Sequence, residues 1–271
     1  MKFRANGLVF ALLITSNLAF AAKICERGLQ LLDLKRDTVG AAAESIIEPF
    51  SVNRGYATLD LKSYIDLGWA EPLFEELTRL QEIAKARRIR GKVRRDLLDG
   101  RLLHFKVLPK EYQTQLRFLA QFVSVIIKRA FPDLMDSAKF VEVDLRWSSN
   151  AFHSPDIQTW HVDGGGLSAI LNLAGPGTEI LGSVTNTGHC EFEDYYLEKL
   201  GKLPTGQIQP GRLLIFSGSY NPELFRHSVV HRSPITNEPR LLIVFRFESV
   251  RSRHMVPIQN DPFRPLAKDP F

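Results

Sequence analysis

Cysteine is scarce in this sequence, which limits what can hold the fold together. Only Cys25 and Cys190 occur among 271 residues, so a disulfide scaffold is excluded as the basis of the fold. In an exported protein these two residues could form one disulfide, and two free buried thiols are the alternative.

Long apolar runs are absent after the N-terminus, so no membrane span is expected. At the N-terminus, Lys2 and Arg4 precede an apolar stretch from Gly7 to Phe20, and Ala19–Ala21 has the A-x-A pattern of a cleavage site. We expect a signal peptide over residues 1–22 and export to the periplasm, the exterior or an endoplasmic reticulum lumen. The alternative is a buried N-terminal helix in a cytoplasmic protein.

The sequence also lacks a strong charge excess. Its formal net charge is +5, which becomes +3 once Lys2 and Arg4 leave with the signal peptide, so no nucleic-acid partner is required. One basic run, Lys85–Arg95, has two interpretations: contact with an acidic partner, or a solvated helix end. We favour the helix end, because the run has no interleaved aromatic residues and the chain has no nucleic-acid motif.

Two amphipathic patterns predict helices in the region 23–138. Apolar residues recur at three and four positions from Ala70 to Ile89, with Pro72 suited to the first turn. A second stripe predicts a helix over Glu111–Phe131, which Pro132 ends.

From residue 139 to 250 the sequence changes to short β-rich runs separated by Gly, Pro and Asn clusters. The predicted strands are Phe140–Trp147, Gln158–Asp163, Leu167–Leu173, Glu179–Val184, Gly206–Gln209, Arg212–Ser217, Phe225–His231 and Arg240–Glu248. Helices followed by strands indicate an α+β fold with a jelly-roll core. The tail over residues 251–271, rich in Pro and charge, is expected to be extended or disordered.

A polar insertion over residues 185–205 interrupts these strands. His189, Cys190, Glu191, Glu193 and Asp194 could form a second metal site there, but their spacing matches no familiar zinc pattern, so we favour an ordinary exposed insertion.

The segment Thr159–Gly166, TWHVDGGG, contains the strongest chemical signal. Side chains two positions apart on a strand share a face, so His161 and Asp163 could occupy neighbouring positions on one metal ion. His231 follows after several predicted strands and would supply a second imidazole. Two histidines and one carboxylate on one face of a metal suit non-haem Fe(II) and leave coordination positions open.

His227 is an alternative third ligand, since it precedes His231 by four residues on the same predicted strand. The two lie about 13 Å apart at ~3.3 Å per residue, so one ion cannot use both. We favour His231, because a plain hairpin from it reaches Arg240, whose planar fork could hold a carboxylate. A supporting or substrate-contacting role is left for His227.

This arrangement, H-x-D, a distant H and a following R in β-strands after N-terminal helices, resembles the Fe(II)- and 2-oxoglutarate-dependent dioxygenases. The resemblance covers roughly Phe140 to Glu248 and implies a double-stranded β-helix. It implies that His161, Asp163 and His231 bind iron and that Arg240 binds the distal carboxylate of 2-oxoglutarate.

The resemblance further implies that Asn172 lines the co-substrate pocket. Some members carry a hydroxyl residue two places after the arginine, where this chain has Leu242, and the prolyl-hydroxylase branch usually has lysine in place of Arg240. The implied reaction hydroxylates an unidentified substrate with release of succinate and CO2. The alternatives are a cupin-like metal enzyme without 2-oxoglutarate, and a non-catalytic jelly-roll binding protein.

Overall fold

The computed structural model describes residues 36–53, 55–86, 89–103, 105–148, 160–163, 166–185, 206–218, 227–234, 236, 238–249 and 255–258. The predicted signal peptide, Cys25, Cys190 and the insertion after Thr185 lie outside the described residues. No helix among the described residues is long and apolar enough to cross a bilayer.

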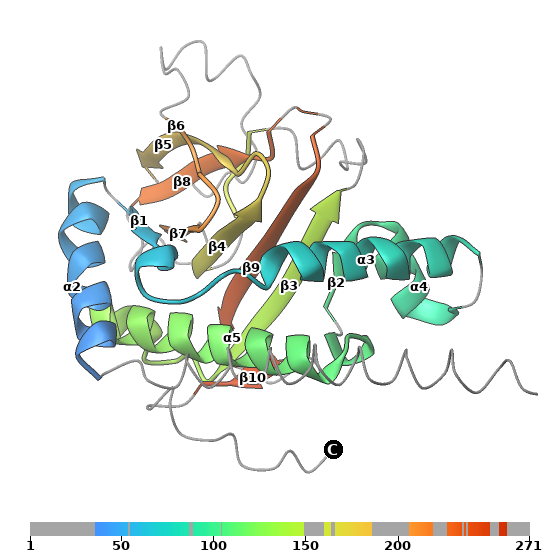
Figure 1. Cartoon of the computed structure of the whole chain (residues 1–271). Helices are drawn as coiled ribbons and strands as arrows, with labels where there is room; N and C mark the ends of the chain where they lie inside the picture. The colour runs from blue at the N-terminus through green and yellow to red at the C-terminus, as the bar shows by residue number, and fades with distance from the viewer. Residues whose placement is uncertain are drawn as a thin grey trace, which may run out of the picture.

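Helices dominate the first half of the described chain and strands the second (Figure 1). The helices are α2 (Arg36–Val52), α3 (Ala70–Lys85), α4 (Gly91–Leu98), α5 (Lys110–Ala130) and α6 (Pro132–Met135), with short 3-10 turns η2 (Leu61–Ser63) and η3 (Phe105–Val107). The strands are β1 (Tyr56–Asp60), β2 (Arg101–Leu102), β3 (Phe140–Ser148), β4 (Leu167–Ala174), β5 (Glu179–Thr185), β6 (Gly206–Gln207), β7 (Arg212–Ser217), β8 (His227–Arg232), β9 (Arg240–Glu248) and β10 (Met255–Pro257).

The strands form two antiparallel sheets. The larger sheet has the order β1-β7-β4-β9-β3-β10, with β2 also paired to β3, and the smaller sheet has the order β6-β5-β8. The predicted α+β fold with a jelly-roll core is confirmed. The region predicted as helical also contributes β1 and β2 to the larger sheet, which the sequence pattern did not indicate.

Strand β9 lies near the centre of the larger sheet and separates two apolar cores. Its odd-numbered residues Leu241, Ile243 and Phe245 face the helices, and Leu242 and Val244 face the smaller sheet. This division follows from the alternation of side chains along a strand. The even-numbered residues of β9 therefore line the space between the two sheets.

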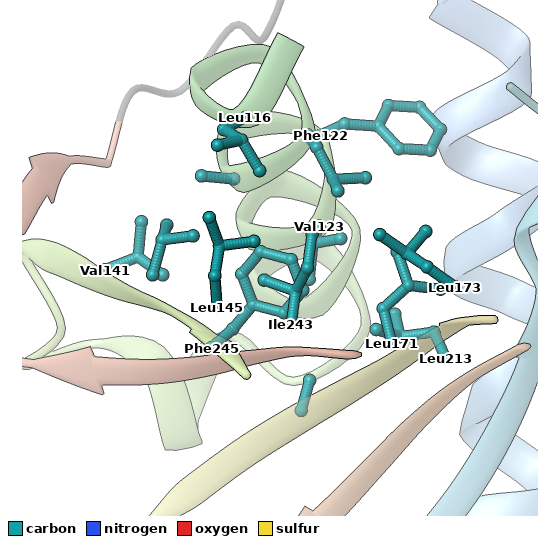
Figure 2. Packing of buried hydrophobic residues seen from close by; sticks show 14 of the residues in the cluster. Leu116, Phe122, Val123, Val141, Leu145, Leu171, Leu173, Leu213, Ile243 and Phe245 are labelled. Atoms are coloured by element: carbon teal, nitrogen blue, oxygen red, sulfur yellow. The ribbon is translucent and has the colours of Figure 1, made fainter. Parts of the chain in front are cut away.

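The core beneath α5 fixes the sheet against the helices. Leu116 and Val123 of α5 pack near Leu145 of β3 and Phe245 of β9, all fully buried (Figure 2). Burying one such side chain contributes about 1.5–3 kcal/mol to folding, so this layer gives the larger sheet a rigid backing.

The basic run Lys85–Arg95 is divided between two helices, and the predicted helix ends at Lys85 instead of Ile89. Helix α4 begins at Gly91, whose φ of +74° favours glycine. Lys85 pairs with Glu82 at 2.7 Å, and Arg94 Nε donates to the Ala84 carbonyl at 3.0 Å. These two side chains support the helix-end interpretation, and an acidic partner stays a prediction.

Two further predictions differ from the structure. Within the predicted strand 158–163, the described residues 160–163 form no strand but one isolated bridge at His161. In the tail, residues 255–257 form β10 on the edge of β3, and Gln121 Nε2 donates to the Pro257 carbonyl, so this part of the tail is fixed to the fold.

Candidate metal centre

One pair of backbone hydrogen bonds joins His161 to His231. The N–H of each residue donates to the carbonyl of the other at 3.0 Å, which forms an isolated antiparallel bridge. His231 lies on β8, and its strand is held by pairing with β5. The bridge therefore places the segment with His161 and Asp163 against a strand that is otherwise distant in sequence.

Three candidate ligand side chains converge at this bridge. His161 Nε2 and His231 Nε2 each lie 3.7 Å from Asp163 Oδ1, and the ligand atoms of all three lie within 4.8 Å of one another. The imidazole rings have centroids 4.6 Å apart and are tilted by 55°. Each side chain thus presents a ligand atom to one common point.

This donor set fits a divalent transition metal. Adjacent ligand atoms about 2.1 Å from an octahedral ion lie about 3 Å apart, so the three groups need to close by less than about 2 Å. Two imidazoles and one carboxylate on one face suit non-haem Fe(II). A closed structural zinc site would require a fourth ligand, and no fourth ligand joins this group among the described residues.

His231 is oriented for ligation by its surroundings. Its Nδ1 lies 3.1 Å from the Val229 carbonyl and donates to it in the tautomer that leaves Nε2 free as a ligand. The Phe216 ring packs edge-on against the imidazole at 4.7 Å. Burial lowers the pKa of His231, and Asp163 opposes this effect only in part. The neutral imidazole, which binds metals, is therefore the form present at neutral pH.

Arg240 begins β9 and lines the same pocket as the three ligand candidates. It is 6% exposed, and its Nη1 is buried without an acceptor among the described residues. Burial and the charge of Arg146 lower the pKa of Arg240 to about 10, so it stays cationic at neutral pH. A buried, unpaired guanidinium requires an anion to offset its desolvation, and a bound carboxylate would supply it.

The rest of the pocket wall contains both apolar and basic side chains. Its lining residues are Arg146, His161, Asp163, Ile170, Thr178, His231, Arg232, Ser233, Arg240, Leu242, Val244 and Arg246. Arg232 is neutralised by Glu179 at 2.6 Å and lies over the Trp160 ring at 4.3 Å. Its charge is thus balanced within the protein, unlike that of Arg240.

A buried carboxylate organises the other arginines. Asp144 is 0% exposed and accepts hydrogen bonds from Arg101, Arg146 and Arg246 at 2.9–3.3 Å. Burial alone would raise the pKa of Asp144, but the three guanidinium groups outweigh it and hold that pKa below its ordinary value. Glu142 accepts from Arg246 at 2.9 Å. This network was not predicted from the sequence.

A signal for the network was present in β3. Glu142, Asp144 and Arg146 alternate with Val143 and Leu145, so one face of this strand carries three charged residues in succession. Charged residues rarely face a core unless they are paired or bind a ligand.

The structure does not bring Asn172 into the pocket lining. Its side chain is fully buried, and Nδ2 donates to the carbonyls of Gly175 and Ile208, each at 3.0 Å. The bond to Gly175 closes the turn after β4, and the bond to Ile208 joins this turn to the segment between β6 and β7. A role for Asn172 in binding 2-oxoglutarate stays a prediction. His227 also lies outside the lining; its carbonyl accepts from the Ser217 hydroxyl at 2.6 Å.

Several solved structures resemble this chain at low identity. A prolyl-4-hydroxylase from Pseudomonas putida is 11% identical with a TM-score of 0.44, covering 77% of this chain and 95% of that chain. The epimerase SnoN, in complex with Fe3+, alpha ketoglutarate and nogalamycin RO, is 13% identical with a TM-score of 0.45, covering 82% and 98%. A viral collagen prolyl hydroxylase from Paramecium bursaria Chlorella virus-1 is 10% identical with a TM-score of 0.40, covering 72% and 90%. Such identities carry no information on substrate.

A search of curated proteins gave no match. A family model described as "Protein of unknown function (DUF1826)" matches residues 70–245, which include both sheets' central strands and all the candidate ligands. The chain belongs to the DUF1826 family.

Proposed function

We propose that this protein is an Fe(II)- and 2-oxoglutarate-dependent dioxygenase that hydroxylates a substrate and releases succinate and CO2. The observation that carries the proposal is the pairing, in one pocket, of the convergent group His161, Asp163 and His231 with the buried, unpaired Arg240. A cluster of three candidate metal ligands alone is compatible with many kinds of metal-binding protein. A fixed cation without a protein partner beside it indicates an anionic co-substrate.

The roles follow from the positions. His161, Asp163 and His231 would hold Fe(II), and Arg240 would orient 2-oxoglutarate by its distal carboxylate. Bound iron and 2-oxoglutarate supply the oxidising chemistry for hydroxylating a C–H bond. Ile170, Leu242 and Val244 form the apolar wall and exclude water from the reacting groups.

Two alternatives make different demands on Arg240. A cupin-like metal enzyme would need the three ligands but no cation for a second carboxylate, and a binding protein would need no metal. The burial of Arg240 without an acceptor favours the dioxygenase, because either alternative leaves its desolvation without compensation.

The proposal is tested by anaerobic loading of the purified protein with Fe(II) and 2-oxoglutarate, followed by air and a succinate assay. We expect iron-dependent succinate, even without added substrate at a slow rate, which His161→Ala and His231→Ala abolish. Metal binding without any use of 2-oxoglutarate would support the cupin-like alternative, and a protein that binds no metal would support the binding module.

We also propose export of this enzyme, on the basis of the pattern in residues 1–22. N-terminal sequencing of the protein from its native cells should begin near residue 23. An N-terminus that retains Met1 or starts at Lys2 would contradict export by this leader.

A further inference from the structure

Arg146 is the neighbour of Arg240 across the β3–β9 pair. The register places Arg240 opposite Ser148, and Arg146 precedes Ser148 by two residues on the same face of β3. Diagonal neighbours of this kind have Cα atoms about 7–8 Å apart, within reach of long side chains. Both arginines line the pocket that contains the three candidate metal ligands.

Arg146 is held in place from behind. Its Nε donates to Asp144 Oδ2 at 3.0 Å, its Nη2 lies 3.0 Å from the same oxygen in an ion pair, and Asp144 is completely buried. The contacts of Arg146 with Asp144 use Nε and Nη2 and leave Nη1 outside this pair, and Nη1 of Arg240 is buried without an acceptor among the described residues. Each guanidinium therefore retains donors for a ligand.

The local charges do not balance. Glu142 and Asp144 are the two carboxylates that contact Arg101, Arg146 and Arg246, so three guanidinium groups share two negative charges. Arg240 adds a further positive charge without a carboxylate partner in the described chain. Two like charges within one low-dielectric pocket repel each other, and an anion between them would reverse this cost.

Leu242 explains why a second cation is needed at this point. It follows Arg240 by two residues on the same face of β9, and it lies directly opposite Arg146. Its side chain offers no hydrogen bond, so β9 by itself presents only Arg240 to a carboxylate. Arg146 can supply the second donor from the adjacent strand.

We propose that Arg146 and Arg240 form an arginine pair that binds a single carboxylate, the distal carboxylate of 2-oxoglutarate. The inference rests on the proposed function and adds to it a second binding residue, supplied by β3 and positioned by Asp144. A dicarboxylic 2-oxo acid is thereby selected over a monocarboxylic one.

Arg146 also lies in the same pocket lining as the candidate ligands and Arg240. A 2-oxo acid that binds the metal by one end and Arg240 by the other would therefore pass next to it.

The test is calorimetric titration of the full-length mature protein, loaded with Mn(II), with 2-oxoglutarate and with pyruvate, which lacks the distal carboxylate. We expect Arg146→Ala to weaken 2-oxoglutarate binding by about 10-fold or more, as for loss of a charge-assisted hydrogen bond, and to leave pyruvate binding unchanged. Arg146→Lys should be intermediate, because lysine keeps the charge and loses the fork. Arg212→Ala, an exposed arginine outside the pocket, is the matched control.

A double-mutant cycle with Arg240→Ala decides whether both residues hold the same carboxylate. Non-additive losses are expected, so that the double variant binds little more weakly than Arg240→Ala alone. Additive losses, equal weakening of pyruvate and 2-oxoglutarate, or unchanged binding in Arg146→Ala would each overturn the arginine pair. Circular dichroism and a thermal melt of every variant verify the fold, and Arg146→Lys carries the test if Arg146→Ala unfolds.

This proposal and the proposed function fail differently. A wild-type protein that binds 2-oxoglutarate through the pair but forms no succinate would refute the dioxygenase alone. Iron-dependent succinate together with normal 2-oxoglutarate affinity in Arg146→Ala and Arg146→Lys would refute the pair alone. A wild-type protein that binds no 2-oxoglutarate would refute both.

Discussion

His161 and His231 exchange both of their backbone hydrogen bonds, at 3.0 Å each, and their imidazole rings lie 4.6 Å apart. The same contact therefore fixes the backbone and sets the side-chain geometry. A strand-borne histidine and a segment that forms no regular strand become one unit through this bridge. The geometry of the candidate metal centre depends on it.

Removing single ligands should abolish metal binding. We expect one Mn(II) or Fe(II) per wild-type chain by equilibrium dialysis, and less than about a tenth of that in Asp163→Ala and His231→Ala, since loss of a ligand costs well over 1.4 kcal/mol. His227→Ala is the matched histidine control, because His227 lies outside the pocket lining. Loss of metal in His227→Ala, with retention in His231→Ala, would reverse the assignment of the third ligand.

The affinity for 2-oxoglutarate should depend on Arg240. In Arg240→Ala we expect the KM for 2-oxoglutarate to rise by about 10- to 100-fold, because a buried charge-assisted contact is lost. Arg240→Lys should recover only part of it. Steady-state succinate formation over a range of 2-oxoglutarate concentrations measures both. An unchanged KM in Arg240→Ala would favour the cupin-like alternative.

Asp144 should stabilise the fold in a pH-dependent way. Asp144→Asn is expected to lower the free energy of unfolding by about 3 kcal/mol at pH 7, the low end for a broken buried pair because the arginines are partly exposed. The pKa of Asp144 is lowered in the folded protein. Its contribution is therefore complete above the unfolded value of about 3.9 and is lost as pH falls through the folded pKa.

Urea unfolding of the wild type and Asp144→Asn between pH 3 and 8 measures this dependence. The two curves should run parallel above about pH 5 and converge at lower pH. Glu82→Gln, which breaks the exposed pair with Lys85, is the control and should cost less than about 1 kcal/mol. A difference that grows on acidification would contradict the assignment.

Gly175 allows the turn after β4 to pack closely against the backbone of Pro239 and Arg240. Its φ is +70°, and a Cβ there would lie 1.9 Å from the Pro239 carbonyl oxygen and 3.0 Å from Arg240 Cα. Gly175→Ala should therefore destabilise by more than about 2 kcal/mol and weaken 2-oxoglutarate binding. Gly91→Ala is the control that measures backbone strain without a steric clash, because Gly91 has a φ of +74° and an added Cβ would have no atom within 4 Å. It should cost about 1 kcal/mol and leave binding unchanged.

Some elements could be predicted from the sequence because their local pattern agrees with their environment. The bounds of β7 and β9 match those expected from the sequence, since both are continuous apolar runs with clear turn signals at their ends. Strand β2 has two residues and α4 contains the second part of the basic run, and neither element was predicted from the sequence. Such elements exist because tertiary packing holds them.

The candidate metal ligands and Arg240 were predictable by residue type and spacing, but the arginine network around Asp144 was not. Asp144 lies 43 residues from Arg101 and 102 from Arg246, and only the pairing of β3 with β2 and β9 brings them together. A sequence pattern contains no register, so it could not reveal that Arg146 faces Leu242. The placement of Asn172 in the pocket lining came from resemblance, and the structure uses its amide to close a turn.

The most direct test of the central claim is the absorption spectrum of the protein under argon, with Fe(II) and 2-oxoglutarate added separately and together. We predict a new visible band only when both are present, because the 2-oxo acid binds the iron itself, and we predict that the band is lost in His231→Ala. Binding of Fe(II) and 2-oxoglutarate without any change in the iron spectrum would show that they occupy separate sites, and would contradict the proposed function.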